Sequence, residues 1–291
     1  MQQINRNIFF EDAYLGVTVG ALVYPHGLIL IDAPLRAEDS RSWRSTLINQ
    51  RGGSNKLLIN LDAHPDRTLG TKALDCTIIA HQNTALVFRN RPTIFKGQSI
   101  ETGAEWETYN ESIGMRWAPP DITFEKRITL HWGGPEVIVE HRPGPSAGSS
   151  WVIIPDAKVI FVGDLVVVNQ PPFLAQADCV SWLASLEDLM TQYKDFSIVS
   201  GRGGLADQED VRLQYKLIKE IGEKLDQLAE KKAAPEQTQE MIPDLLSYFK
   251  SQPEYRDQFH HRLTHGLYQA YLYRSKLADN LGQIESDEID Q

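Results

Sequence analysis

The stretch "INLDAHPDRTLG", residues 59–70, places an apolar, strand-like run directly before a loop of acidic, imidazole and guanidinium side chains. Asp62, His64, Asp66 and Arg67 lie within this loop. Because α/β folds collect functional groups at the carboxyl ends of strands, the stretch predicts a site at one edge of a sheet. The residue types fit a metal site, the remnant of one, or a helix cap with a loop histidine.

The sequence on both sides of this stretch alternates between predicted strands and helices. Residues 14–34 predict a hairpin, because "YPHG" has turn chemistry and joins two apolar, β-branched runs. A helix is predicted over 37–53, with acids at its start and a glycine pair as its stop signal. Further elements follow in strand–helix order, with strands at 56–61 and 77–81 and helices at 64–74 and up to about 90.

A second run of strands follows a bridging segment that carries Trp106, Tyr109 and Trp117. The apolar stretches that predict these strands lie within 121–132, 136–144, 150–156 and 158–168. A helix over 178–193, a buried strand over 196–201 and a long helix over 207–232 complete the pattern. Strands and helices that alternate twice, with hairpins in each half, favour two sheets sandwiched between helices.

Composition narrows the class of protein. A chain of 291 residues with 42% apolar content suffices for one large domain plus an appendage. The net charge of −10, with no basic stripe between aromatic residues, argues against nucleic acid as a partner. No basic, apolar leader and no membrane-length apolar run is visible, so we expect a cytoplasmic protein with no membrane contact. Cys76 and Cys179 lack metal-like spacing and are predicted to be reduced, buried thiols.

Five further segments each stand at the end of a predicted strand, namely "ILIDA", "IIAH", "RPGPSAGSS", "FVGD" and "VSGRGG". Together with residues 59–70, and in this order, they resemble the metallo-β-lactamase fold superfamily from about residue 14 to residue 210. Members of that family carry an early strand-end Asp, an H-x-H-x-D-H loop, a G-H-T/S segment, a G-D turn and a late G-H-G. The resemblance implies an α/β (α+β) fold, a four-layer αββα sandwich over 1–205, with C-terminal helices over 206–280. The acidic tail, 281–291, is expected to be disordered.

The same resemblance implies where the family's metal ligands would lie. The seven positions fall on Asp62, His64, Asp66, Arg67, Pro145, Asp164 and Arg202, and only His64, Asp66 and Asp164 match. Proline has no side-chain donor, and arginine stays protonated and cannot give a lone pair. The second metal position is therefore predicted to be lost, and the first keeps at best Asp62, His64 and Asp164. We expect no cofactor, with one zinc, iron or manganese ion at these three residues as the alternative.

Charge balance predicts what takes the place of the metal. Two carboxylates at about 4 Å, with an effective dielectric near 20, repel each other by about 4 kcal/mol. Arg67 and Arg202 are therefore expected to pair with Asp66 and Asp164 in a metal-free pocket. The expected pocket residues are Asp62, Arg67, Pro145, Ser146, Arg202 and His81, with His64, Asp66 and Asp164 as vestigial or atypical catalytic residues. Asp32 and His81 are favoured as groups that shape strand ends.

Residues beyond 233 predict a polar link, "AAPEQTQE", and then helices over 239–250 and 254–279. The second helix has an apolar stripe, which is expected to pack across the mouth of the sandwich or against a second copy of the chain. That stripe is Phe259, Leu263, Leu267, Ala270 and Tyr271. His261 and His265 have i,i+4 spacing, but no acidic residue that could act as a base lies between them, which favours a solvated or interfacial face.

Three hypotheses for function follow, in order of preference. The first is a metal-free pseudoenzyme that binds a small molecule or a protein partner. The second is an atypical hydrolase of the same fold, with one metal ion or with His64 as a metal-free general base. The third is a structural protein that forms oligomers through its C-terminal helices. Fold alone does not decide between them.

Overall fold

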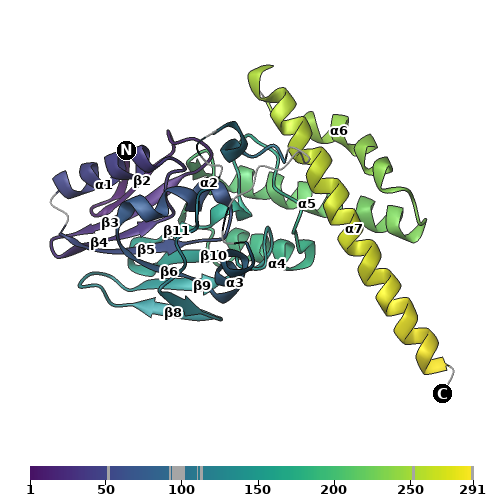
Figure 1. Cartoon of the computed structure of the whole chain (residues 1–291), viewed down its shortest axis with the longest axis horizontal. Helices are drawn as coiled ribbons and strands as arrows, with labels where there is room; N and C mark the ends of the chain where they lie inside the picture. The colour runs from purple at the N-terminus through teal and green to yellow at the C-terminus, as the bar shows by residue number, and fades with distance from the viewer. Residues whose placement is uncertain are drawn as a thin grey trace.

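The computed structural model describes residues 1–50, 53–91, 93, 102–109, 111, 114–250 and 253–289, with side chains as far as residue 275 in the last helix. Its centre is a pair of facing β-sheets (Figure 1). The first sheet has seven strands in sequence order: β1 (Gln2–Asn5), β2 (Ile8–Glu11), β3 (Val19–Tyr24), β4 (Gly27–Ile31), β5 (Asn55–Asn60), β6 (Thr77–His81) and β7 (Ile122–Phe124).

The second sheet has six strands in the order β13-β12-β11-β10-β9-β8. Their bounds are β8 (Arg127–Leu130), β9 (Val137–His141), β10 (Ser150–Ile154), β11 (Val159–Phe161), β12 (Ser197–Val199) and β13 (Leu205–Ala206). Neighbouring strands are antiparallel except β11 and β12 in this sheet and β4 to β7 in the first. The parallel strands bring their carboxyl ends, and the loops that follow, to common edges.

Side chains that point alternately to the two faces of each strand build the layers of the core. In β3, Leu22 and Tyr24 face the second sheet, where they join a cluster that includes Phe161. Val19 and Ala21 point the opposite way, into a cluster with the first sheet's outer helix. Adjacent residues of a strand point to opposite faces, so a strand covered on both sides reads as continuously apolar.

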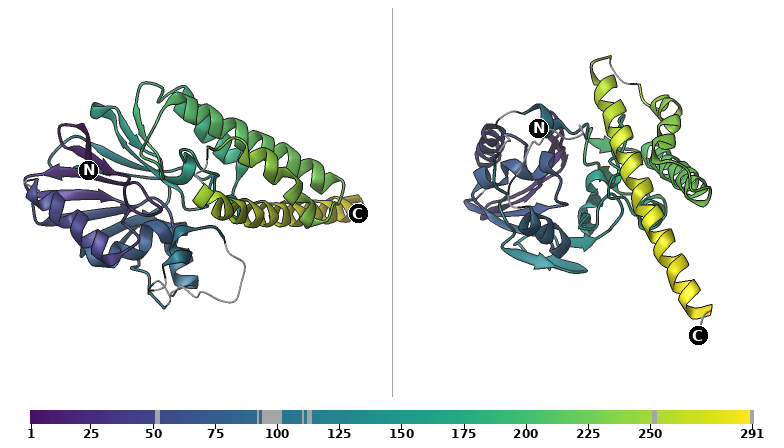
Figure 2. Two further views of the ribbon diagram at one scale, coloured as in Figure 1. Left: turned by 90° about the horizontal axis from the view of Figure 1, so that it is seen from above. Right: turned by 45° about the vertical axis from the view of Figure 1, so that its right-hand side comes forward.

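Helices cover both outer faces of the sheet pair (Figures 1 and 2). Beside the first sheet lie α1 (Ala37–Asn49), α2 (Pro65–Thr68), η1 (Leu69–Leu74) and α3 (Gln82–Asn90), with η2 (Glu105–Thr108) near α2. Beside the second sheet lie α4 (Cys179–Met190) and α5 (Gln208–Glu230), with the short turns η4 (Pro155–Ala157) and η5 (Gly163–Leu165) in its loops. The four-layer sandwich predicted from the sequence is confirmed.

The chain ends in a helical extension that packs beside α5: η6 (Pro235–Met241), α6 (Ile242–Leu246), η7 (Pro253–Tyr255) and α7 (Arg256–Ile289). The predicted apolar stripe of α7, from Phe259 to Tyr271, belongs to the core cluster that also holds α4 and α5, so it packs within the chain. The last turns of α7 point away from the sandwich (Figure 2). No helix in the described ranges has both the length and the apolar character needed to cross a membrane.

Local elements differ from the sequence prediction in four places. β1 and β2 were not predicted, because a four-residue strand carries too little pattern. The stretch 121–132 divides between sheets, since β7 joins the first and β8 the second. The single helix predicted over 64–74 is a short α-helix followed by a 3-10 helix. The backbone of α7 is helical to Ile289, into the acidic tail, while Gly52 of the predicted stop signal and residues 290–291 lie outside the described residues.

Candidate functional site

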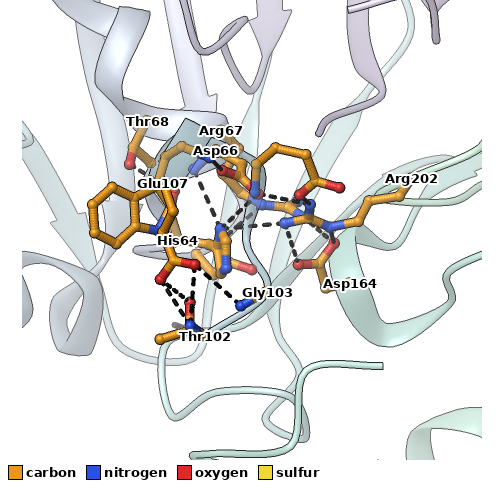
Figure 3. Close-up of polar contacts among 12 residues, drawn as sticks. His64, Asp66, Arg67, Thr68, Thr102, Gly103, Glu107, Asp164 and Arg202 are labelled. Carbon is orange, nitrogen blue, oxygen red and sulfur yellow. Dashed lines mark hydrogen bonds and ion pairs between the residues drawn. The ribbon is translucent and has the colours of Figure 1, made fainter. Parts of the chain in front are cut away.

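Four loops place charged side chains at one edge of the two facing sheets. Asp32 follows β4, Asp62 follows β5, Asp164 lies in η5 after β11, and Arg202 follows β12. Gly201 lets two of these loops approach, because a Cβ there would lie 2.5 Å from the Asp164 carboxylate and 2.4 Å from the carbonyl carbon of Gly163. These side chains are buried, and Figure 3 shows Asp164 and Arg202 side by side in the cluster that they form.

Arg67 is fully buried and lies among three aspartates. Its Nη1 donates to Asp32 Oδ2 at 2.9 Å, and its Nη2 donates to Asp164 Oδ1. Its Nε lies 3.2 Å from Asp62 Oδ1, without the geometry of a hydrogen bond. All three carboxylates come from strand ends of the sandwich, so this guanidinium group joins the two sheets through the centre of the site.

Arg202 lies on the other side of Asp164 and has a different set of partners. Its Nε and Nη2 donate to the two oxygens of Asp164, and its Nη1 donates to Asp66 Oδ2 and Glu105 Oε2, both at 2.8 Å. Its Nη2 also lies 3.2 Å from His64 Nδ1. Two arginines thus share Asp164, as expected from charge balance, and one of them reaches Asp66 as well.

Besides its ion pair with Arg202, Asp66 accepts hydrogen bonds at the start of η2. Its carboxylate accepts the backbone N–H groups of Glu105 at 3.3 Å and Trp106 at 2.7 Å, which are the first two residues of η2. A carboxylate at this place satisfies N–H groups that have no partner inside the helix. Asp66 therefore holds η2 against the site, and η2 supplies Glu105 to Arg202.

Arg262 extends this cluster to the C-terminal extension. It stands on α7, is 1% exposed, and donates to Glu105 Oε1, to Gln170 Oε1 and to the carbonyl oxygens of Gly103 and Pro171. The ring of Phe173 lies 4.1 Å from its guanidinium carbon and 4.5 Å from that of Arg202. Glu105 and Phe173 therefore both contact the two arginines and join α7 to the site.

His64 is the N-cap of α2, whereas the helix-cap alternative expected an aspartate as the cap and the histidine only as a loop residue. Its Nδ1 accepts the backbone N–H of Asp66 at 3.2 Å and lies beside Arg202 Nη2, which can only donate. Burial and the positive charge of Arg202 hold the pKa of His64 well below its ordinary value. The ring is therefore neutral at pH 7, with its proton on Nε2.

The pKa values of the carboxyl groups in this cluster are shifted in opposite directions. Burial works against ionisation of Asp164, but Arg202 and Arg67 outweigh it and lower the pKa of this carboxyl group. Burial raises the pKa of Asp32 to about 7 and also raises the pKa of Asp62, with Arg67 opposing the effect in both. Asp164 is thus the carboxylate most strongly held in its charged form by the arginines.

A cavity of about 280 Å³ lies beside this cluster. Its lining includes Asp62, His64, Asp164, Pro145 and Ser146, all predicted site residues. The lining does not include Arg67 or Arg202, and Arg202 lines a second cavity instead. His81 is not in the lining either. It stacks on His141 with ring centroids 3.8 Å apart, caps α3 and contacts the carbonyl of Glu125, so it shapes a strand end.

The residues at this edge do not fit the metal ions of the family. Both oxygens of Asp164 accept hydrogen bonds from arginine, and His64 Nδ1 accepts from a backbone N–H. Guanidinium groups cannot ligate a metal ion and repel one. In the part of the chain that the structure describes, no group of three or more His, Cys, Asp or Glu side chains could hold a metal ion, and this includes His261 and His265.

Three residues of the cluster were not predicted from the sequence: Glu105, Phe173 and Arg262. Glu105 lies in the bridging segment, in which only the aromatic residues were noted. Arg262 lies inside the apolar stripe of α7, between Phe259 and Leu263. A charged residue on the buried face of an amphipathic helix is the one signal that could have pointed to it, because such a residue needs a partner.

Comparisons with known proteins agree with the observed fold. A family model described as the metallo-beta-lactamase superfamily matches residues 69–199. No curated protein matches the sequence. Among solved structures, a metallo-beta-lactamase from Pontibacter korlensis is similar, with a TM-score of 0.60, 19% identity, and 75% of this chain and 97% of that chain covered. DIM-1 metallo-beta-lactamase exposed to ceftazidime has a TM-score of 0.59 and 16% identity, with 75% and 95% covered.

Proposed function

Since the chain is a metallo-β-lactamase-fold protein in which four of the seven ligand positions have lost the family's residue, we propose that it works without a metal ion, as a pseudoenzyme that binds a small molecule. One observation carries the proposal. Arg67 and Arg202, at two of the lost ligand positions, form ion pairs with the carboxylates that remain. The positive charge that the family takes from metal ions is supplied here by side chains.

The cavity beside the cluster supports binding of a small molecule. It is concave, largely apolar and open beside buried polar groups, which is the usual character of small-molecule sites. Polar side chains such as Thr84, Ser146 and Gln176 in its lining can fix the orientation of a ligand. The cavity has a size suited to a compact molecule.

The arrangement of His64 argues against the hydrolase alternative. A general base needs a lone pair that faces the substrate, with a partner that orients the other ring nitrogen. Here Nδ1 accepts from the N–H of Asp66, while the carboxylate of Asp66 lies 3.6 Å away and is held by Arg202. The proton therefore stays on Nε2, where a base would need its lone pair.

Metal analysis of the purified chain tests the proposal. We expect well below one equivalent of zinc, iron or manganese per chain, both as purified and after incubation with zinc followed by desalting. His64→Ala should leave the trace metal content unchanged. A stoichiometric metal ion that is lost in His64→Ala would contradict the proposal and favour the hydrolase with a single metal.

A further inference from the structure

Charge in the cluster beside the cavity is not balanced by the described side chains. Five carboxylates, those of Asp32, Asp62, Asp66, Asp164 and Glu105, face three guanidinium groups, those of Arg67, Arg202 and Arg262. Every arginine is already shared between at least one carboxylate and other acceptors. Carboxyl groups therefore outnumber guanidinium groups by two, so full ionisation of all five would need a further cation.

Asp62 is the carboxylate with the fewest partners. Asp164 and Asp66 each accept three hydrogen bonds, whereas Asp62 accepts one, from the backbone N–H of His64 to Oδ1. Within the described residues no hydrogen bond reaches Asp62 Oδ2. Asp62 is 4% exposed and lines the cavity, so a buried carboxyl group with spare acceptor capacity borders the space where a ligand would lie.

The arrangement of charges around the cavity favours a cation. Asp62 and Asp164 line it, whereas Arg67 does not and Arg202 lines a different cavity. Arg91 is the one Lys or Arg side chain in the described lining, and it is exposed to solvent. An anionic ligand would meet the two buried carboxylates first, which makes anion binding unfavourable.

The remaining lining supplies surfaces for an apolar or aromatic body. Trp106, Trp117 and Phe173 all contribute to it. Aromatic rings attract organic cations through their negatively charged faces and also cover apolar area. Phe173 already contacts two guanidinium groups in the structure.

We propose that this cavity binds a small organic amine, whose ammonium group donates a hydrogen bond to Asp62 Oδ2 and whose apolar body contacts the three aromatic side chains. The inference rests on the proposed function and names the ligand class of the same cavity. The amine would supply the positive charge that the arginines leave missing. A neutral molecule of the same shape lacks this charge, and an acid of the same shape reverses it.

A matched set of three probes tests this inference by calorimetry: phenethylamine, 2-phenylethanol and phenylacetate, titrated into the full chain at pH 7. Phenethylamine should bind about tenfold to one-hundredfold more tightly than 2-phenylethanol, since a charged hydrogen bond contributes about 1.5 to 3 kcal/mol. Phenylacetate should bind less tightly than the alcohol. Equal binding of the three, tighter binding of phenylacetate, or no binding of any probe would overturn the inference.

Substitution of Asp62 tests whether its carboxylate is the group that binds the amine. Asp62→Asn keeps an acceptor for the His64 N–H, and it should lower amine affinity to about that of the alcohol, a loss of about tenfold to one-hundredfold. Asp156→Asn, an exposed residue of η4, is the matched control and should change neither affinity. Unchanged amine affinity in Asp62→Asn would overturn the inference. If Asp62→Asn does not fold, the comparison of the three probes on the unmodified chain still decides.

Failure of this inference is distinguishable from failure of the proposed function. Tighter binding of phenylacetate would leave a metal-free binding protein with the opposite ligand charge. A stoichiometric metal ion would contradict the proposed function itself.

Discussion

Arg67 and Arg202 both stand at positions that the resemblance to the metallo-β-lactamase fold superfamily assigns to metal ligands, and both are buried, but their surroundings differ. The partners of Arg67 are three aspartates at strand ends of the sandwich. Arg202 pairs with two motif aspartates and also with Glu105, which in turn pairs with Arg262 of α7. One arginine thus balances charge inside the sandwich, and the other connects the sandwich to η2 and the C-terminal helices.

Because of this difference, we expect removal of Arg67 and removal of Arg202 to have different structural consequences. Removal of Arg67 leaves Asp32, Asp62 and part of Asp164 without a counter-charge, and its cluster contains no second cation close to Asp32 among the described side chains. Removal of Arg202 still leaves Arg262 beside Glu105 and Arg67 beside Asp164. The Arg67 region is therefore more dependent on a single residue.

Substitution of each arginine should give the largest effects. Breaking a buried pair typically costs about 3 to 5 kcal/mol, and we expect Arg67→Ala at or above the upper end and Arg202→Ala near the lower end. Addition of Asp164→Asn should recover part of the loss in both backgrounds, since it removes one anion from a cluster that has lost a cation. Urea unfolding at pH 7 measures these four variants, the Asp164→Asn single variant and the unmodified chain. Losses of about 0 to 1 kcal/mol, as for exposed pairs, would contradict the buried network.

Arg262→Gln tests the link between Arg202 and α7. The change removes the ion pair with Glu105 and most of the hydrogen bonds to Gly103, Gln170 and Pro171, at a cost of about 1 to 3 kcal/mol. Hydrogen exchange should become faster in residues 256–270 and stay unchanged in β4 and β5. Arg256→Gln, at the exposed start of the same helix, is the control. Equal hydrogen-exchange rates in both variants would contradict a link between Arg202 and α7 through Arg262.

Substitution of His64 should give the smallest effect, which is a change in how stability depends on pH. Its pKa is lowered in the folded chain, so below about pH 6.5, where an unfolded histidine takes up a proton, the unfolded state binds more protons and stability falls. Between pH 7 and pH 5.5 this should cost roughly 1 kcal/mol. His64→Gln should lose this part of the slope, whereas His260→Gln, on the exposed side of α7, should keep it. Equal slopes in all three proteins would show that His64 takes up protons freely.

The sequence predicted the fold and the Arg67 half of the site better than the Arg202 half. Asp32, Asp62, Asp164 and Arg67 each follow a predicted strand or a motif landmark, so their convergence follows from sheet topology. Glu105 and Arg262 carry no such landmark, since a bridging segment and a helix have many charged residues. Which of these charged residues points into the core depends on long-range packing. The periodicity of a sequence carries no information about such packing.

The bridge that Glu105 makes between Arg202 and Arg262 also bears on how this chain could change in evolution. A histidine at position 202 would leave Glu105 with one cation instead of two and would remove the ion pair of Asp66. We expect metal ligands introduced one at a time to lower stability before any ion could bind. Residues outside the motif therefore constrain position 202, and building a metal site at this edge would require changes in η2 and α7 as well.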